Sequence, residues 1–290
     1  MKIISEIIKK ILYYSLKFLW RAGEVSFICF IILLFLFRSH SFQTFFAGKV
    51  TAFYSFELGT DFFVDRVKLN GFQYLELHDL FIADLAGDTL VYSPLLKANL
   101  KDISLENKFA VLDYIISENA RVKIQHYKDS EATNLQFILD YFNQSPSSSD
   151  VFTVKIDRIG LKGAHLSYFN WNTPETEYGL DYDHLEFKNF SGDVLELRNR
   201  NGITSVDLDG ISFSESSGLT IDELSGHFVY NPKKIKLEKF SLKTPTTSIQ
   251  SKGIALNYRD VEDLKDFVNA VYIEGAIQPS NLDFKDLSYF

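Results

Sequence analysis

The six histidines are the side chains of this sequence best suited to bind a metal or to transfer protons near neutral pH. Metal sites usually take several ligands from one short stretch of chain, at spacings of about two to five residues. The histidines are scattered, and no two have such a spacing: His40, His78, His126, His165, His184 and His227. The sequence therefore gives no indication of a histidine-based metal site.

Acidic residues offer a second kind of chemistry, and two clusters of them stand out. Asp181 and Asp183 precede His184, but acidic residues on the solvent face of a strand explain this run more simply. Asp207 and Asp209 stand before a glycine, as at the start of a calcium-binding loop, but Ser and Phe occupy the remaining ligand positions. Neither cluster predicts a metal site.

The common catalytic motifs are absent from the sequence. It contains no phosphate-binding glycine loop, no nucleophile elbow and no paired-cysteine motif, and Cys29 is its only cysteine. A pair of carboxylates on a strand surface could hydrolyse glycosides, but nothing in this Asp-rich chain selects one pair. We therefore expect no enzyme, no cofactor and no metal.

Charge is distributed unevenly along the chain. The first 24 residues carry five basic and two acidic side chains, a net charge of +3, against −8 for the whole chain of 290 residues. The remaining residues therefore carry −11. An acidic body of this kind lacks the basic surface that displaces counterions from phosphates, so nucleic acid is not expected as a partner.

The uncharged run 25–37 predicts a transmembrane anchor that follows a cytoplasmic tail. Thirteen helical residues span about 20 Å, and Trp20, Arg21 and Arg38 can extend this toward the hydrocarbon thickness of about 30 Å. A cleaved signal peptide is the alternative, but the preceding region is long and itself apolar. In both cases the body is exported. The predicted anchor residues are Val25, Phe27, Ile28, Phe30, Ile31, Ile32, Leu33, Leu34, Phe35, Leu36 and Phe37.

Most of the exported body has the alternating hydrophobic pattern of β-strands. The stretch 75–100 is typical of two strands joined by a turn. Further alternating segments are found at 67–69, 121–124, 152–156, 164–169, 184–187, 205–213 and 234–242. Turn residues separate them at 70–71, 87–88, 191–193, 201–202, 217–218 and 231–232.

Three segments instead predict short helices. Residues 42–58 could form a helix beside the membrane, and 132–142 and 259–270 have apolar residues at helical spacing. On the first helix the expected apolar side comprises Phe42, Phe45, Phe46, Val50 and Phe53. The Ser-Pro-Ser-Ser-Ser connector at 145–149 marks a boundary between two parts of the body.

Alternating strands have one apolar face, and two or three helices can cover little of it. A second sheet would give an ordinary sandwich, whereas an open curled sheet would present a hydrophobic trough. Our hypothesis is that ten residues line such a trough, and the alternative for each is a packed β core. They are Val154, Ile156, Leu166, Tyr168, Val206, Leu208, Phe213, Ile235, Leu237 and Leu242.

Two segments of the sequence resemble a known family. LELHDLFIADLAGDTLVYSPLLKANLKDISL and YIISENARVKIQHYKDSEATNLQFILDYF are similar to the N-terminal region of TamB-like proteins of the AsmA-like superfamily, especially members from Bacteroidota. The likeness extends over nearly the whole chain. The matching positions are Asp84, Gly87, Asp88, Thr89 and Leu90, and then Asn134, Phe137, Ile138, Leu139, Asp140 and Phe142.

This resemblance implies an inner-membrane anchor that carries a long periplasmic β-structure with an apolar groove. Family members are thought to pass phospholipids between the two membranes, or to assist outer-membrane protein assembly with a barrel partner. They are several times longer than this chain, which we therefore expect to be a truncated form or one piece of a split system. About fifteen strands stacked at about 4.8 Å would extend about 70 Å.

The expected fold is thus mostly β: an N-terminal transmembrane helix, then an elongated, curled antiparallel sheet forming a groove, with two or three short helices. The expected divisions are 1–41 for tail and anchor, 42–144 for a first periplasmic segment and 150–290 for a second groove segment. The expected partners are the inner-membrane bilayer, phospholipid acyl chains and an outer-membrane barrel protein. The main functional alternative is a scaffold or assembly factor for outer-membrane proteins.

Overall fold

The computed structural model describes Arg21 and residues 39–71, 73–104, 106–107, 109–143, 153–200, 203–261, 263 and 267–289. The predicted anchor at 25–37 and the predicted connector at 145–149 lie outside these residues. Among the helices within them, none has both the length and the apolar character needed to cross a bilayer.

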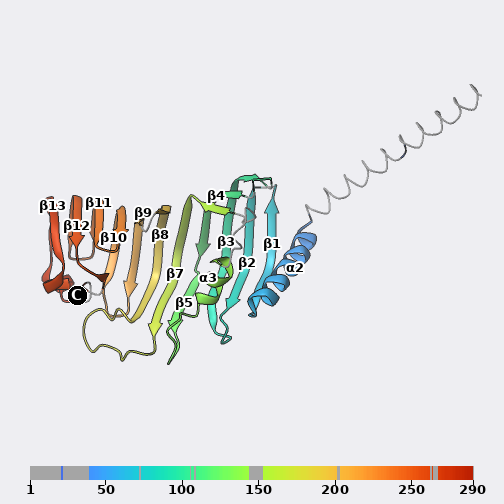
Figure 1. Ribbon diagram of the computed structural model, residues 1–290. Helices are drawn as coiled ribbons and strands as arrows, with labels where there is room; N and C mark the ends of the chain where they lie inside the picture. The colour runs from blue at the N-terminus through green and yellow to red at the C-terminus, as the bar shows by residue number, and fades with distance from the viewer. Residues whose placement is uncertain are drawn as a thin grey trace, which may run out of the picture.

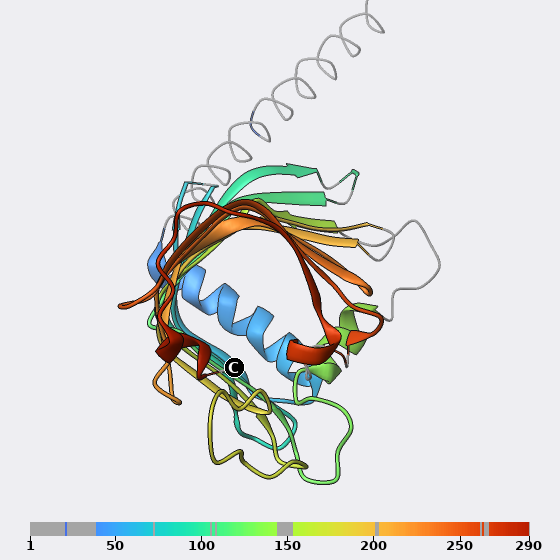
Figure 2. The same cartoon turned by 90° about the vertical axis from the view of Figure 1, so that its left-hand side faces the viewer.

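Thirteen strands in the described residues form a single curled sheet (Figures 1 and 2). The strands are β1 (Phe62–Asn70), β2 (Tyr74–Ala83), β3 (Thr89–Ser104), β4 (Phe109–Glu118), β5 (Arg121–His126), β6 (Thr153–Ile156), β7 (Arg158–Asn170), β8 (His184–Arg200), β9 (Ile203–Glu215), β10 (Thr220–Asn231), β11 (Lys234–Lys243), β12 (Ser248–Asn257) and β13 (Tyr272–Ile277). The main path through the sheet runs β1-β2-β3-β4-β7-β8-β9-β10-β11-β12-β13. The prediction of a mostly β, curled sheet is confirmed.

The prediction that this sheet is entirely antiparallel is wrong at its centre. β4 pairs in parallel with β6 and β7, and β5 pairs in parallel with β7. Parallel neighbours need a crossover connection of about a dozen residues or more. The stretch 127–152 provides it between β5 and β6. Alternating patterns look alike in both arrangements, so the sequence could not reveal the change of direction.

The same parallel pairs carry the sheet across the division expected at 145–149. β4 and β5 belong to the first expected segment, and β6 and β7 belong to the second. Their backbone hydrogen bonds therefore join both segments into one continuous sheet.

Four short helices in the described residues accompany the sheet. They are α2 (His40–Leu58), α3 (Gln136–Asn143), α4 (Phe267–Ala270) and α5 (Phe284–Leu287). The first three lie in the segments expected to be helical. α2 lies beside β1 at one end of the sheet (Figure 1).

Bulges inside the strands bend the sheet. The register shifts within the β7–β8 pair, the β8–β9 pair and both pairs of β10. Asn189 of β8 and Lys239 of β11 have positive φ angles of 54° and 50° at such shifts. A bulge adds an unpaired residue and bends its strand, so bulges on neighbouring strands curl the whole sheet. The turn expected at 191–193 is wrong for this reason: these residues lie inside β8.

Candidate functional site

Helix α2 identifies the concave face of the sheet. Its Ala47 packs against a buried cluster of Val64, Val67 and Leu80 on β1 and β2. Figure 2, which looks along the curled sheet, shows α2 inside the outline of the curl, and Figure 1 places the helix at the β1 end. Side chains on the same face as this cluster therefore line the concave side.

The concave face carries apolar side chains in rows that cross many strands. Residues directly opposite each other on paired strands project to the same side. One such row runs from β1 to β9 and ends beside Gly226 of β10: Leu69, Leu75, Ala98, Ile115, Ile159, Val194 and Leu208. The apolar surface is thus continuous across the parallel junction.

Two further rows extend this surface. The second crosses β1, β2, β3, β5, β7 and β8: Phe62, Ile82, Val91, Val122, Leu166 and Phe187. The third crosses β9 to β12: Val206, Phe228, Leu237 and Ile254. Together the rows form the apolar lining of a trough.

Three aromatic rings of this lining pack together. Phe213 of β9 lies 4.9 Å from Phe187 and 5.7 Å from Phe190, measured between ring centroids. The sequence hypothesis included Phe213 but missed both residues of β8. Because a bulge at Asn189 separates them, their spacing of three hides the fact that they share a face.

All ten residues of the lining hypothesis lie on the concave side according to the strand register. Val154 and Ile156 pair with Ala110 and Leu112 of β4, and the others lie in or beside the rows described above. Val154 is 56% exposed and the other nine are half-buried. A packed core would bury them, so the lining is open. Whether it contacts lipid stays a prediction.

One carboxylate lies at the end of the second row. Glu215 pairs with Phe187, is buried, and lies at the turn into β10. Its oxygens accept hydrogen bonds from the backbone N–H groups of Glu186, at 3.2 Å, and Ser217, at 2.6 Å. This group is therefore bound by the backbone at the rim of the trough.

The convex face carries ion pairs between neighbouring strands. They are Lys68–Glu76 (3.1 Å), Lys97–Glu118 (2.8 Å), Arg158–Asp193 (2.7 Å), His165–Glu186 (2.9 Å) and His227–Asp207 (2.7 Å). A hydrogen bond from Lys97 lowers the pKa of Glu118. Surface pairs of this kind contribute only about 0–1 kcal/mol each. These pairs place the charged side chains on the convex face and leave the concave face to apolar residues.

The Asp-Tyr-Asp-His run lies at the end of the loop before β8 and not on a strand face. Asp181 accepts hydrogen bonds from the backbone N–H groups of Thr176 and Asp183, at 2.9 and 3.1 Å, and contacts His184 at 2.9 Å. The hydrogen bonds of Asp181 therefore stabilise the conformation of the loop that contains it. Among the described residues, no three His, Cys, Asp or Glu side chains lie close enough together to hold a metal ion.

Polar side chains of α2 form hydrogen bonds with main-chain N–H and carbonyl groups at the edge of β1 that does not pair with β2. The Gln43 amide accepts from the Leu69 N–H (2.9 Å) and donates to the Leu69 carbonyl (3.3 Å). Ser55 makes the same pair of bonds with Phe62, at 2.9 and 3.0 Å. Two of the residues expected on the apolar side of this helix, Phe45 and Phe53, do not pack on the sheet and are 64% and 55% exposed.

A pocket of about 410 Å³ lies between α2 and the first two strands. Two polar residues reach it, Gln43 and Thr51, and both are hydrogen-bonded to the backbone. Its remaining lining is apolar: Phe42, Ala47, Val50, Phe62, Val64, Val67, Leu69, Leu75 and Leu77. Because Leu69 and Leu75 begin the first row, the pocket is continuous with the trough lining.

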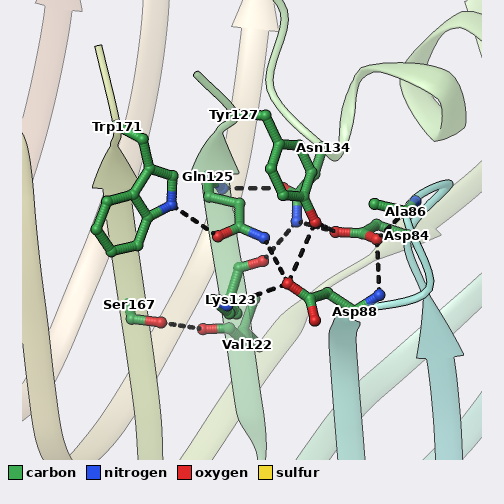
Figure 3. A network of polar contacts seen from close by, with 10 residues as sticks. All are labelled: Asp84, Ala86, Asp88, Val122, Lys123, Gln125, Tyr127, Asn134, Ser167 and Trp171. Carbon is green, nitrogen blue, oxygen red and sulfur yellow. Dashed lines mark hydrogen bonds and ion pairs between the residues drawn. The ribbon is translucent and has the colours of Figure 1, made fainter. Parts of the chain in front are cut away.

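A polar network outside the trough joins three loops (Figure 3). Asp84 accepts hydrogen bonds from Tyr127 (2.7 Å), from Asn134 (2.9 Å) and from two backbone N–H groups of its own turn. Gln125 receives a bond from the indole of Trp171 at 3.0 Å. The network fixes the β2–β3 turn to the chain before α3 and to the chain after β7.

The charge of Asp84 is stabilised although the residue is only 1% exposed. Burial is the largest single effect and raises its pKa, but the hydrogen bonds from Asn134, Tyr127 and the turn together lower the pKa below its ordinary value. Burial, and then the bond to Asp84, raise the pKa of Tyr127. Both groups keep their usual charges at neutral pH, as suits a structural role.

No family model and no curated protein matches this chain.

Proposed function

We propose that this protein is an inner-membrane-anchored, periplasmic protein whose concave face shelters phospholipid acyl chains during transfer between the inner and outer membranes. The observation that carries the proposal is the open lining: continuous apolar rows on the concave face of a single sheet, with the ion pairs on the convex face. The resemblance to TamB-like proteins supports the same function.

The size of the hydrophobic effect favours an acyl chain as the ligand. Each methylene moved out of water is stabilised by about 0.8 kcal/mol, so a chain of about sixteen carbons needs shelter worth about 12 kcal/mol. The first row spans seven strands without an interrupting charge and provides such shelter along its length.

The substitution Leu208→Asp tests this function. Leu208 lies opposite Val194 and beside Gly226, in the first row. A carboxylate there interrupts the lining, and we expect loss of lipid adducts from a photocrosslinking amino acid placed at Phe213. Because Leu208 is half-buried in an open trough, we expect the free energy of unfolding to fall by less than about 2 kcal/mol.

The matched control is Val229→Asp on β10. Val229 pairs with Ser205 and Lys236, so it lies on the convex face, and its substitution should leave the lipid adducts unchanged. Equal loss of adducts in both variants, or unfolding of Leu208→Asp, would contradict the proposal. Unfolding would mean that these residues form a packed core.

A scaffold for outer-membrane protein assembly is the second candidate, and the edge of the sheet at β13 favours it. All six residues of β13 are exposed, and among the described strands β12 is the one that pairs with it. A free edge of this kind can accept a strand from a protein client. Purification from mild detergent with a bound protein and without phospholipid would support the scaffold instead.

A further inference from the structure

The side of α2 that faces away from the sheet is aromatic. Phe45, Phe53 and Phe56 are 64%, 55% and 84% exposed, and they share one side of the helix with Lys49. The ammonium group of Lys49 lies 5.5 Å from the centre of the Phe45 ring. Grouped, exposed aromatic side chains of this kind mark an interaction surface.

The hydrogen bonds of α2 explain why this aromatic side faces outward. Gln43 and Ser55 must face β1 to bond its free edge, and Ala47 packs on the strands between them. Turning the phenylalanines inward would leave the N–H and carbonyl groups of Leu69 and Phe62 without these partners. The aromatic side therefore points away from the sheet. The helix itself lies at the β1 end of the molecule (Figure 1).

We propose that this aromatic side of α2 lies in the headgroup region of the phospholipid bilayer. The argument combines position with composition. The uncharged run of the sequence ends at Phe37, and α2 begins at His40, so a membrane that holds the run is adjacent to the helix. Interfacial helices place Phe, Leu and Trp about 5–10 Å into the boundary between headgroups and acyl chains, and they use Lys to attract anionic lipids.

This placement has a consequence for the trough. The pocket between α2 and β1 would lie at the bilayer surface, so the apolar lining would begin where lipids are held. The inference rests on the membrane placement in the proposed function, but it does not depend on lipid transfer.

Depth-dependent fluorescence quenching tests the inference in the full chain. We would replace Cys29 by Ser and then introduce single cysteines by Phe45→Cys, Phe53→Cys and Phe56→Cys, each labelled with bimane. The protein would be reconstituted into vesicles of phosphatidylethanolamine and phosphatidylglycerol, with and without doxyl-labelled lipid. The control is Tyr272→Cys on β13, which is 69% exposed at the other end of the sheet.

We expect doxyl lipid to reduce the fluorescence at the three α2 positions and to leave the Tyr272→Cys control unchanged. Quenching at α2 no greater than at the control would overturn the inference. So would quenching by spin-labelled copies of the protein in place of lipid, because the surface would then bind a second copy. Failure of the chain to float with vesicles would contradict membrane placement and the proposed function together, whereas flotation without quenching overturns this inference alone.

Discussion

Asp84 links a sequence motif to a structural role at the scale of single residues. The resemblance to TamB-like proteins includes Asp84 and Asn134, which are fifty positions apart, and the structure joins them by a hydrogen bond of 2.9 Å. The same carboxylate receives the Tyr127 hydroxyl and two N–H groups of its own turn. These residues hold loops together at one edge of the trough, and none of them belongs to the apolar lining.

The substitution Asp84→Asn tests this role. The new amide places a donor where the carboxylate accepted bonds, so at least one of Tyr127 and Asn134 loses its partner. Leaving buried groups unpaired in this way costs about 2–4 kcal/mol of the free energy of unfolding. Urea denaturation measures the loss. Asp88→Asn is the comparison variant: this side chain is 53% exposed, so losing its bonds from Lys123, Gln125 and Tyr127 should cost less than the loss at the buried Asp84.

The lowered pKa of Asp84 also predicts how stability depends on pH. The folded state binds the proton of this carboxyl less tightly than the unfolded state, whose pKa is about 3.9. The stabilisation is therefore complete above this value and is lost as the pH falls through the lower folded-state pKa. Between pH 5 and pH 2, approximately, the wild type should lose more stability than Asp84→Asn. Parallel curves for the two proteins would show that Asp84 does not contribute in this way.

At the scale of elements, the alternating pattern predicted where strands lie but not how they bend. Residues 75–100 do form two strands joined by a turn. Leu77 and Leu80 belong to one cluster although they are three residues apart, because Asp79 between them has a positive φ of 51° that the pattern does not predict. Ser191-Gly192-Asp193 has the composition of a turn, yet β8 continues through it. Local composition does not distinguish a bulge from a turn, because both use small residues and positive φ angles.

The helix α2 shows a second limit of prediction from sequence. Periodicity placed its phenylalanines on one apolar side, but it did not show which side of the helix packs on the sheet. The free edge of β1 instead requires hydrogen-bonding side chains, and Gln43, Thr44 and Ser55 provide them. Only knowledge of which strand ends the sheet would have revealed this requirement.

The bulge in β8 can be tested through Asn189. Its φ of 54° is in the left-handed region, which Asn tolerates and β-branched residues do not. We expect Asn189→Val to lower the free energy of unfolding by about 1–2 kcal/mol, as measured by chemical denaturation. Asn189→Gly is the matched control and should stay within about 0.5 kcal/mol of the wild type. Equal stability of all three proteins would mean that β8 is not bent at this position.

At the scale of the whole molecule, the two ends of the sheet differ. At one end α2 bonds the edge of β1, and at the other end β13 presents a free and exposed edge. The main path contains eleven strands, ten spacings of about 4.8 Å, so the trough is about 50 Å long. This is shorter than the 70 Å expected from about fifteen strands. A longer trough would need further strands, and the free edge of β13 is where they could pair.

Hydrogen exchange measured by mass spectrometry should show this difference between the ends. Edge strands normally exchange fast, because half of their N–H groups face solvent. In β1 the N–H groups of Phe62, Val67 and Leu69 instead donate to Ser55, Thr44 and Gln43 of α2. We therefore expect peptides from β1 to exchange more slowly than peptides from β13, and Gln43→Ala to speed exchange in β1 alone. Slow exchange in β13 of the isolated chain would mean that its edge is already paired. It would contradict the proposed difference between the bonded edge of β1 and the free edge of β13.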